Sequence, residues 1–369
     1  MENPFKFGSV VDKTHFTNRK EEIKSLTSIL ESHNHAVLIS PRRYGKTSLI
    51  LNVVKQFQRP VIYLDLQIIS SITDFAGELL KRVYSNYPMQ KIRSLIAKFR
   101  IIPTLNVNPV NGELSVNFQP AKSENIIIED VFNLLESISK PSNKVIVVFD
   151  EFQEVKSISS NLDRQLRAIM QHHKNVNYVF LGSRESMMKE IFEHKKSPFY
   201  HFGYLITIQK IPFDDFMSYL SEGFKLLSES YADIAGQILE ITDCHPYYTQ
   251  QLAFTVWEKL RQGADSKDAV KPAIESLIST HDYDYERLWN NFNQTDKNIL
   301  IHFSISNESP LKDEIAKGMG LATSTLFSGL KRLCESGYLI RNLKSYEIDD
   351  PFFKLWIVRR RNMDWNSSL

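Results

Sequence analysis

The sequence feature that most constrains the fold is the stretch "AVLISPRRYGKTSLI" at positions 36–50. An apolar run is followed by a short polar loop, and Gly-Lys-Thr then opens a second apolar run. This order predicts a buried strand, a phosphate-binding loop and a helix, in which backbone N–H groups form a cup above the helix N-terminus. Gly45 allows close approach of the backbone, Lys46 is placed to reach the β- and γ-phosphates, and Thr47 to bind magnesium.

The loop departs from the pattern GxxxxGK[ST] at its first position, where Ser40 replaces glycine. Pro41 restricts the residue before it to extended geometry, which a strand end already has, so we expect the replacement to be tolerated. Taken alone, the motif could also be a coincidental Gly-Lys-Thr in a strand–helix turn. Of the two arginines, we expect one to contact phosphate or a neighbouring domain and the other to point into solvent. The predicted nucleotide-binding residues of the loop are Ser40, Pro41, Arg42, Arg43, Tyr44, Gly45, Lys46, Thr47 and Ser48.

A second motif, "KVIVVFDEFQEV", is an apolar strand pattern that ends in Asp150 and Glu151. Magnesium prefers one or two carboxylates together with water and phosphate oxygens, and Asp150 at a strand end can supply one of them. Glu151 beside it is the natural group to orient and deprotonate an attacking water. A lone acidic pair at a strand end often only faces solvent, but its position downstream of Gly-Lys-Thr favours a hydrolytic site.

A third strand pattern, "NYVFLGSRES", ends in Ser183 and Arg184. In P-loop enzymes with an Asp-Glu strand of this kind, the neighbouring strand carries a polar residue that senses the γ-phosphate. Ser183 can donate a hydrogen bond to that phosphate, and Arg184 can offset the charge that develops on it during transfer. The alternative for Arg184 is a surface arginine at a strand end.

The first two hundred residues alternate apolar strand patterns with helical patterns. The strand patterns are rich in Val and Ile without period-two alternation, which is typical of a parallel sheet buried on both faces. They are "HAVLIS", "PVIYLDL", "KVIVVFD" and "VNYVFLGS". This alternation predicts an α/β core of three layers, and "TLNVNPVNGELSVNF" interrupts it with an Asn-Gly hairpin signal.

The remainder of the chain has a different pattern, which predicts three domains in all: a P-loop ATPase core at 1–205, a helical lid at 206–282 and a winged-helix domain at 283–369. The middle part contains apolar residues at helical spacing, as in "PYYTQQLAFTVWEKLRQ". The last part has the order of three short helices followed by two strands, which is the order of a winged helix-turn-helix. Gly320 is expected in the turn and Gly337 at the end of the third helix.

Composition excludes several classes of protein. The 369 residues are 42% hydrophobic and 24% charged, which is typical of a globular chain of more than one domain. The formal net charge of +2 gives no argument for nucleic acid or membrane as a partner. Cys244 and Cys334 lack metal-ligand spacing, no signal-peptide core or apolar run of bilayer length is present, and we expect a cytoplasmic protein.

These motifs together resemble the archaeal-type ATPase family, a branch of the STAND class of P-loop ATPases related to AAA+. The resemblance covers nearly the whole chain. Besides "PRRYGKTSL" and "VFDEFQE", it includes "FTNRKEE" near the N-terminus, "DCHPYYTQQL" on the predicted lid and "YEIDDPFFKLWIVRR" near the C-terminus. Cys244 stands where the family's lid element has glycine.

The resemblance implies a nucleotide-controlled switch. It implies that ATP and Mg²⁺ are bound, that Phe16 and Arg19 lie near the base of the nucleotide, and that Pro246 on the lid contacts the adenine or ribose. The alternative for Pro246 is a simple helix-initiating proline. The family implies that nucleotide docks the lid and winged helix on the core, that hydrolysis releases them, and that turnover is slow without a protein client.

A second function class is a DNA-binding regulator whose nucleotide site is mainly structural. From residue 283 to 369 there are 12 Lys or Arg and 11 Asp or Glu, whereas a dedicated duplex reader has a basic face. The near-neutral balance therefore favours a protein surface over DNA as the partner of the winged helix. Arg359, Arg360 and Arg361 form a cationic cluster that is either a partner contact or a solvated tail.

Overall fold

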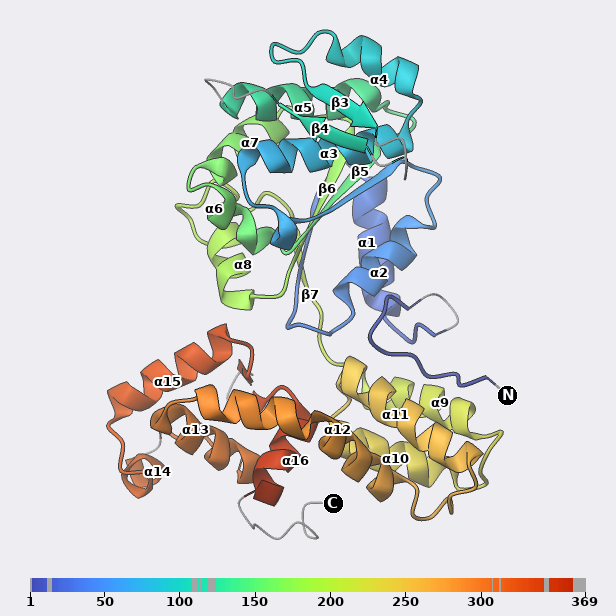
Figure 1. The fold of residues 1–369 in the computed structure, drawn as a ribbon, viewed down its shortest axis with the longest axis vertical. Helices are drawn as coiled ribbons and strands as arrows, with labels where there is room; N and C mark the ends of the chain where they lie inside the picture. The colour runs from blue at the N-terminus through green and yellow to red at the C-terminus, as the bar shows by residue number, and fades with distance from the viewer. Residues whose placement is uncertain are drawn as a thin grey trace. The chain divides into compact units, whose positions relative to one another are not determined.

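The computed structural model describes residues 2–11, 15–107, 112, 114–118, 124–306, 308–311, 313–341 and 345–360, and it divides into two compact units (Figure 1). The first, which we call the sheet unit, consists of Arg19–Ser40 and Lys46–Ile208. The second, the helical unit, consists of Met1–Asn18, Pro41–Gly45 and Gln209–Leu369. The phosphate-loop segment is thus grouped with the helical unit, while its two flanks belong to the sheet unit.

The sheet unit is built on five parallel strands in the order β2-β5-β6-β1-β7. Their bounds are β1 Ala36–Ile39, β2 Val61–Asp65, β5 Val145–Asp150, β6 Val176–Gly182 and β7 Tyr204–Thr207. The parallel α/β sheet and its four expected strands are confirmed. The edge strand β7 is an addition, because its four residues lack the longer apolar run of the other strands.

Strand burial follows from position in the sheet. Every residue of β1, β5 and β6 is buried, as expected for inner strands covered on both faces. In β2, at the edge of the sheet, buried and partly buried residues alternate. A cluster of aromatic rings from the inner strands, including Phe149, Tyr178 and Phe180, forms the centre of the core.

Helices cover the sheet, and Figure 1 shows α1 and α2 on one side of the strands and α6 and α8 on the other. The helices of the sheet unit are α1 Lys20–Glu31, α2 Lys46–Val54, α3 Ile72–Asn86, α4 Met89–Ile96, α5 Glu124–Ile138, α6 Val155–Ile158, α7 Leu162–Met170 and α8 Glu185–Phe192. Two short 3-10 turns, η1 Leu66–Ile68 and η2 Phe152–Glu154, follow β2 and β5. Ser71 caps α3 by accepting a hydrogen bond from the backbone of Asp74.

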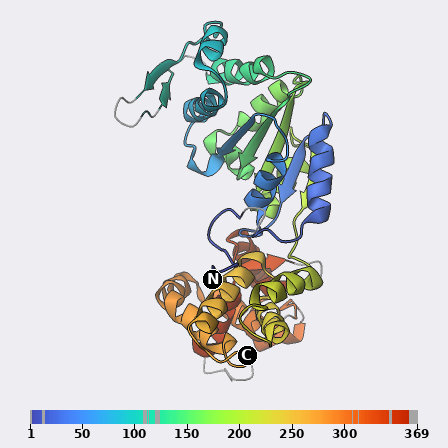
Figure 2. The same cartoon turned by 90° about the vertical axis from the view of Figure 1, so that its right-hand side faces the viewer.

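The predicted hairpin is confirmed by its strand pairing. Strands β3 Thr104–Val107 and β4 Leu114–Asn117 are antiparallel and form a two-stranded sheet of their own. Figure 2 shows this hairpin lying apart from the five-stranded sheet. Asn111 of the Asn-Gly turn lies outside the described residues.

The helical unit contains eight helices and one small sheet in the described part of the chain. They are α9 Phe213–Phe224, α10 Tyr231–Thr242, α11 Pro246–Arg261, α12 Val270–Asn291, α13 Gln294–Ile305, α14 Asp313–Gly318, α15 Thr323–Glu335, β8 Leu339–Arg341, β9 Tyr346–Ile348 and α16 Pro351–Arg360. One continuous helix, α12, crosses the predicted domain boundary at residue 282. The division into lid and winged-helix domains at this residue stays a prediction.

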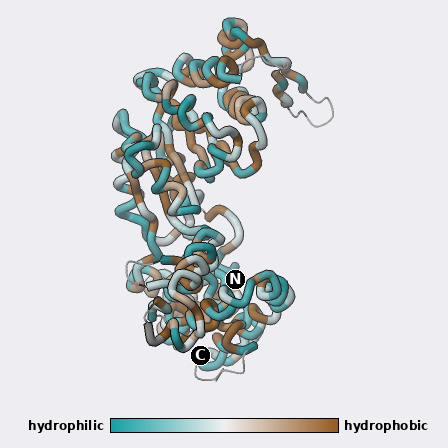
Figure 3. The backbone as a smooth tube through the Cα atoms, turned by 90° about the vertical axis from the view of Figure 1, so that its left-hand side faces the viewer, coloured by the Kyte–Doolittle hydropathy of each residue, from teal (hydrophilic) through white to brown (hydrophobic). Residues whose placement is uncertain are grey.

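The helices of both units are amphipathic. Figure 3 shows hydrophobic and hydrophilic segments alternating along them, as expected when one face of each helix is buried. In the helical unit one continuous hydrophobic core joins residues from α9 to α16, with Trp257 and Trp356 among its largest buried side chains. No helix in the described part of the chain combines the length and apolar composition needed to cross a bilayer.

Candidate nucleotide site

The predicted site residues of the sheet unit meet at the carboxyl edge of the parallel strands. Strand pairing places Asp65 opposite Asp150 and Ile39 opposite Gly182. Ser40 and Ser183 directly follow the last two of these residues. In open α/β sheets ligands bind at this edge, because every parallel strand delivers its following loop there.

The phosphate loop begins at the end of β1 and ends at the start of α2. Ser40 is fully buried, and its backbone N–H donates to the carbonyl of Gly182 at 3.4 Å. Ser40 is not among the residues with positive φ, so this position accepts a side chain. Gly45 has a φ of +85°, where a side chain would be strained, so glycine is required here. The Lys46 ammonium donates to the Ser40 carbonyl at 3.1 Å.

Thr47 and Asp150 are brought together as expected for residues that share one ligand. The hydroxyl Oγ1 of Thr47 donates to Oδ2 of Asp150 at 3.0 Å. Tyr63 of β2 also donates its hydroxyl to Oδ2 of Asp150, a contact that sequence reasoning missed. Burial, followed by the nearby charge of Asp150, raises the pKa of Tyr63, so this hydroxyl keeps its proton and acts as a donor. The sequence places Tyr63 two residues before the end of a strand, but it does not show that this strand pairs with β5, which brings Asp150 close.

Glu151 is held by two side chains on one of its oxygens. Its φ of +51° is in the left-handed region, which turns the chain sharply after β5. Oε2 accepts a hydrogen bond from Ser183 Oγ at 2.6 Å and another from Gln153 Nε2. Both hydrogen bonds found for this carboxylate among the described residues reach Oε2, so Oε1 keeps its capacity to accept a proton.

Gln153 is a further site residue that sequence reasoning missed. Its side chain is 1% exposed, and it lies in the 3-10 turn directly after the Asp-Glu pair. A Cβ added at Gly182 would lie 2.7 Å from Gln153 Oε1 and 2.3 Å from atoms of Met188. Glycine at 182 thus makes room for the amide that orients Glu151. No local signal in the sequence reveals this role, because the burial of Gln153 arises only when η2 packs against β6.

Asp65 adds a third carboxylate at the same edge. It ends β2 opposite Asp150, and it caps the following turn by accepting from the Gln67 backbone at 2.9 Å. Burial raises the pKa of Asp65, and the negative charges of Asp150 and Glu151 raise it further, whereas the Gln67 hydrogen bond opposes the shift. The strand ends therefore form a region of concentrated negative charge, which a divalent cation would stabilise.

The middle of the phosphate loop makes its contacts within the helical unit. The guanidinium of Arg43 donates to the Tyr248 hydroxyl at 2.9 Å and lies 4.7 Å from the centre of the Tyr247 ring. Tyr44 packs its ring against His245 at 4.8 Å. Both Arg42 and Arg43 are exposed, and Arg43 is the one held by defined contacts with Tyr247 and Tyr248.

In the predicted lid element, His245 sets the start of the helix. His245 caps α11, because its Nδ1 accepts from the backbone N–H groups of Tyr247 and Tyr248 at 3.2 and 3.5 Å. Pro246 is the first residue of α11. Cys244, which replaces the family's glycine, has a φ of +56°. The left-handed conformation explains why a glycine is favoured at this position.

The remaining predicted residues are less closely grouped. Arg19 is 4% exposed and pairs with Glu22 at 3.0 Å at the start of α1. Phe16 is partly buried in the helical unit, and Ser48 is buried on α2. Arg184 forms an ion pair with Glu154 at 3.5 Å, and its side chain is 43% exposed. The structure thus gives Arg184 a carboxylate partner outside the Asp150–Glu151 pair.

The donor set fits magnesium and a triphosphate. Thr47 and Asp150 offer oxygen donors side by side, and Lys46 and the loop N–H groups offer positive charge to phosphates. No group of three or more His, Cys, Asp or Glu side chains within the described ranges is arranged to hold a metal ion. Magnesium does not need such a group, because it keeps several waters and binds through one or two protein oxygens and the phosphates.

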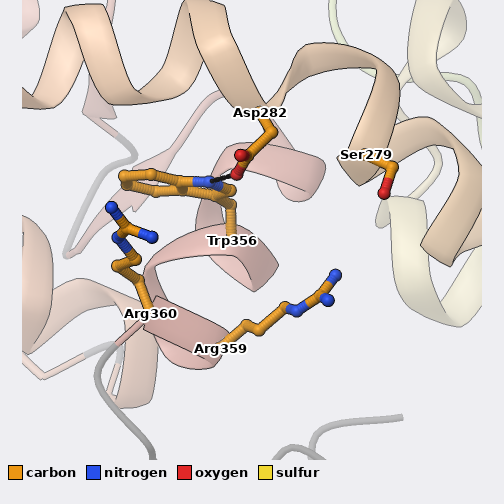
Figure 4. Close-up of a pocket in the computed structure, with 5 residues that line it drawn as sticks. All are labelled: Ser279, Asp282, Trp356, Arg359 and Arg360. Carbon is orange, nitrogen blue, oxygen red and sulfur yellow. Dashed lines mark hydrogen bonds between the residues drawn. The ribbon is translucent and has the colours of Figure 1, made fainter.

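A separate pocket lies in the helical unit, between α12 and α16 (Figure 4). Trp356 donates its indole N–H to Asp282 at 2.7 Å, and the guanidinium of Arg360 lies 5.9 Å from the centre of the Trp356 ring. Arg360 also pairs with Glu286. Two members of the predicted cationic cluster, Arg359 and Arg360, thus line this pocket, and Arg361 lies outside the described residues.

A parallel α/β sheet with a phosphate loop after β1 and an Asp-Glu pair after β5 defines a P-loop nucleotide-binding core. Residues 16–252 match the family model of an ATPase domain found predominantly in Archaea. That match covers more than half of the chain, which therefore belongs to this family of ATPase domains.

Relatives of this chain share about a quarter of its residues over the matched segments. A protein of Methanocaldococcus jannaschii is 26% identical over 332 residues, which is 88% of this chain and 62% of the relative. A protein of the same organism described as ATP-binding is 26% identical over 204 residues, covering 47% of this chain and 53% of the relative. The chain thus spans less than two thirds of the length of these relatives.

Solved structures support the fold. A Walker-type ATPase of Pyrococcus abyssi superposes with a TM-score of 0.67 at 22% identity, covering 94% of this chain and 97% of the other. The ORC2 protein of Aeropyrum pernix, described in ADPNP–ADP complexes, has a TM-score of 0.54 at 13% identity and covers 96% and 98% of the two chains. At these identities the likeness shows the shared fold alone.

Proposed function

We propose that this chain is a Mg-dependent ATPase that acts as a nucleotide-controlled molecular switch. The observation that carries the proposal is the convergence of two distant motifs, in which Thr47 Oγ1 of the loop helix lies 3.0 Å from Asp150 Oδ2. Membership of an ATPase-domain family and the ATP-binding description of a relative support it. The finer assignment to the STAND class rests on the sequence motifs.

In the proposed reaction each residue has a separate task. Lys46 and the loop N–H groups would hold the phosphates, and Thr47 and Asp150 would hold magnesium, which neutralises charge on the phosphate oxygens. Glu151 would accept a proton from the attacking water at Oε1, while Ser183 and Gln153 fix the carboxylate through Oε2. The buried position of Gln153 restricts the rotation of that carboxylate.

The helical unit would supply the regulatory part. We propose that α13, α14, α15 and the β8–β9 hairpin form a winged helix, which their order along the chain supports. On α15, Arg332 pairs with Asp296 at 2.6 Å and Lys331 lies 3.8 Å from Glu335. Because these cations already have carboxylate partners, we favour a protein client over duplex DNA.

Calorimetry with the full chain tests nucleotide binding. Lys46→Ala should weaken MgATP binding by about 10- to 100-fold, because it removes a charged hydrogen-bond donor to phosphate. Lys55→Ala is the matched control, since it removes the same charge from an exposed position just after α2. Equal dissociation constants for wild type and Lys46→Ala would refute the proposed site.

A further inference from the structure

A chain of contacts links the phosphate loop to the start of the last helix, and all of its members belong to the helical unit. We call Arg43, Tyr248 and Asp350 the relay. The first step is the hydrogen bond from Arg43 Nη1 to the Tyr248 hydroxyl at 2.9 Å. The guanidinium carbon of Arg43 also lies 4.7 Å from the ring centre of Tyr247 and 5.7 Å from that of Tyr248. Both distances are within the range of a cation–π interaction.

The second step joins Tyr248 to the start of α16, where its ring packs edge-on against that of Phe352 with the centroids 5.6 Å apart, and Phe352 donates its backbone N–H to Asp350. Tyr248 is only 3% exposed, and burial together with the negative charge of Asp350 raises its pKa. Tyr248 is therefore a neutral hydroxyl. Burial lowers the pKa of Arg43, but Tyr248, Tyr247 and Asp350 more than offset this effect and its pKa is raised. The guanidinium is thus stabilised in its charged form by groups of the helical unit.

Asp350 is itself anchored at the N-terminus of α16. Its Oδ1 accepts from the backbone N–H groups of Phe352 and Phe353 at 2.9 and 3.1 Å. Its Oδ2 accepts from the Tyr285 hydroxyl at 3.0 Å. A carboxylate with this many donors is fixed in position, so the end of the relay remote from the phosphate loop is rigid.

The loop end of the relay has a different character. Arg43 has a φ of +65°, which is unusual for a residue with a side chain. Its partner Tyr248 is neutral, whereas hydrogen bonds from a guanidinium to an anion are about twice as strong as neutral ones. A phosphate on the loop would therefore be a stronger partner for Arg43 than the tyrosine hydroxyl.

From this difference we infer that Tyr248 and Asp350 are positioning residues for Arg43, which hold its guanidinium on the helical unit in competition with nucleotide phosphate at the loop. The inference rests on the proposed ATP site. Arg43 then has two arrangements, one bonded to Tyr248 and one bonded to phosphate. A ligand shifts such an equilibrium only by its differential affinity for the two arrangements. By reciprocity, phosphate bound at the loop would weaken the hold on Arg43 at Tyr248.

The test measures dissociation constants of MgATP and of adenosine for full-length variants. Tyr248→Phe keeps the ring but removes the hydroxyl, so it should tighten MgATP by about three- to tenfold, the range for a net hydrogen bond. Adenosine carries no phosphate, and its affinity should not change. In an Arg43→Ala background, Tyr248→Phe should have no effect on MgATP, because the guanidinium that it releases is missing.

Two further variants separate positioning from folding. Tyr219→Phe removes another tyrosine hydroxyl of the helical unit, a partly buried one that accepts from Gln250 at 3.1 Å, and should leave nucleotide affinity unchanged. If Tyr248→Phe does not fold, Asp350→Asn takes its place, since the amide oxygen can still accept from the backbone of α16, and it should also tighten MgATP.

The outcomes distinguish the relay from the site itself. Suppose that the wild type binds MgATP, that this binding depends on Lys46, and that Tyr248→Phe binds MgATP equally or more weakly. This result would overturn the relay but not the proposed ATP site. The relay is also overturned if Tyr248→Phe increases MgATP affinity equally in the Arg43→Ala background, or if it increases adenosine affinity equally. In either case the effect of Tyr248→Phe does not depend on Arg43 and phosphate. Absence of any MgATP binding by the wild type overturns the proposed function and the relay together.

Discussion

The strand-end cluster of the sheet unit and the relay of the helical unit are built from different chemistry. The cluster consists of Thr47, Asp150, Glu151 and Ser183, whose short polar side chains follow buried strands or open a helix. The relay consists of an arginine that is hydrogen-bonded to a tyrosine and of an aspartate at the start of α16, which Phe352 links to the tyrosine ring. The first arrangement suits a metal and a reacting water, and the second suits adjustment of binding.

The two regions also differ in how they are assembled. In the cluster each residue lies at the end of a parallel strand or at the start of the helix that follows one, so the pairing of strands in one sheet sets its position. In the relay Arg43, Tyr248 and Asp350 are separated by about a hundred residues or more at each step. Residues held by one buried sheet are fixed relative to one another, whereas the relay joins a loop to two helices and responds to a change in any of them. We therefore propose that the cluster carries turnover and that the relay adjusts the affinity for nucleotide.

The largest effect should come from Glu151→Gln. Loss of a general base typically reduces turnover by about 10²- to 10⁴-fold, while the amide keeps the shape and leaves MgATP affinity nearly unchanged. Phosphate release over time and calorimetry on the same sample measure the two quantities. Glu190→Gln, an exposed position on α8, is the control. Turnover of Glu151→Gln at the wild-type rate would remove this residue from the chemistry.

A smaller effect is the dependence of stability on pH, and its sign should differ between the sheet unit and the helical unit. Burial, with smaller contributions from Arg167 and His173, lowers the pKa of His35 from 6.5 to about 4. As pH falls below about 6.5, the unfolded chain gains a proton that the folded sheet unit does not, so the sheet unit should lose about 1–2 kcal/mol between pH 8 and pH 5. Burial raises the pKa of Asp350, so that group alone favours the helical unit at acid pH.

Separate probes can follow the two units in this experiment. All the tryptophans among the described residues, Trp257, Trp289 and Trp356, lie in the helical unit, so their fluorescence reports on its unfolding. Hydrogen exchange of peptides from β5 and β6 reports on the sheet unit. His35→Gln should flatten the pH dependence of exchange, and His194→Gln, at an exposed position, should not. Equal protection of β5 and β6 at both pH values would contradict the assignment.

The same contrast explains what the sequence could predict. The inner strands and the cluster were predictable, because a buried parallel strand is a continuous apolar run and the polar residue after it must lie at the sheet edge. Gln153 and Tyr63 were missed because their roles depend on what the neighbouring strand places opposite them. Burial of Gln153 is visible only once η2 and β6 are packed together.

The relay could not be predicted from its motifs. The double arginine and the Pro-Tyr-Tyr and Asp-Pro elements are each visible in the sequence, but nothing local says that Arg43 contacts Tyr248. The edge strand β7 was not predicted for a related reason. Its short sequence carries no strand pattern, and it is recognised as a strand only through its pairing with β1. The domain boundary that the sequence pattern predicted at residue 282 lies within the continuous helix α12, and it stays a prediction.

The most direct test of this division of tasks combines one change in each region. The measurement is the MgATP dissociation constant of the double variant Glu151→Gln/Tyr248→Phe, compared with that of Glu151→Gln alone. If the cluster performs the chemistry and the relay adjusts affinity, the two changes are independent, and the double variant should bind about three- to tenfold more tightly, as Tyr248→Phe does by itself. An unchanged dissociation constant, or a gain that depends on an intact Glu151, would show that the two regions are not separate and would contradict the account.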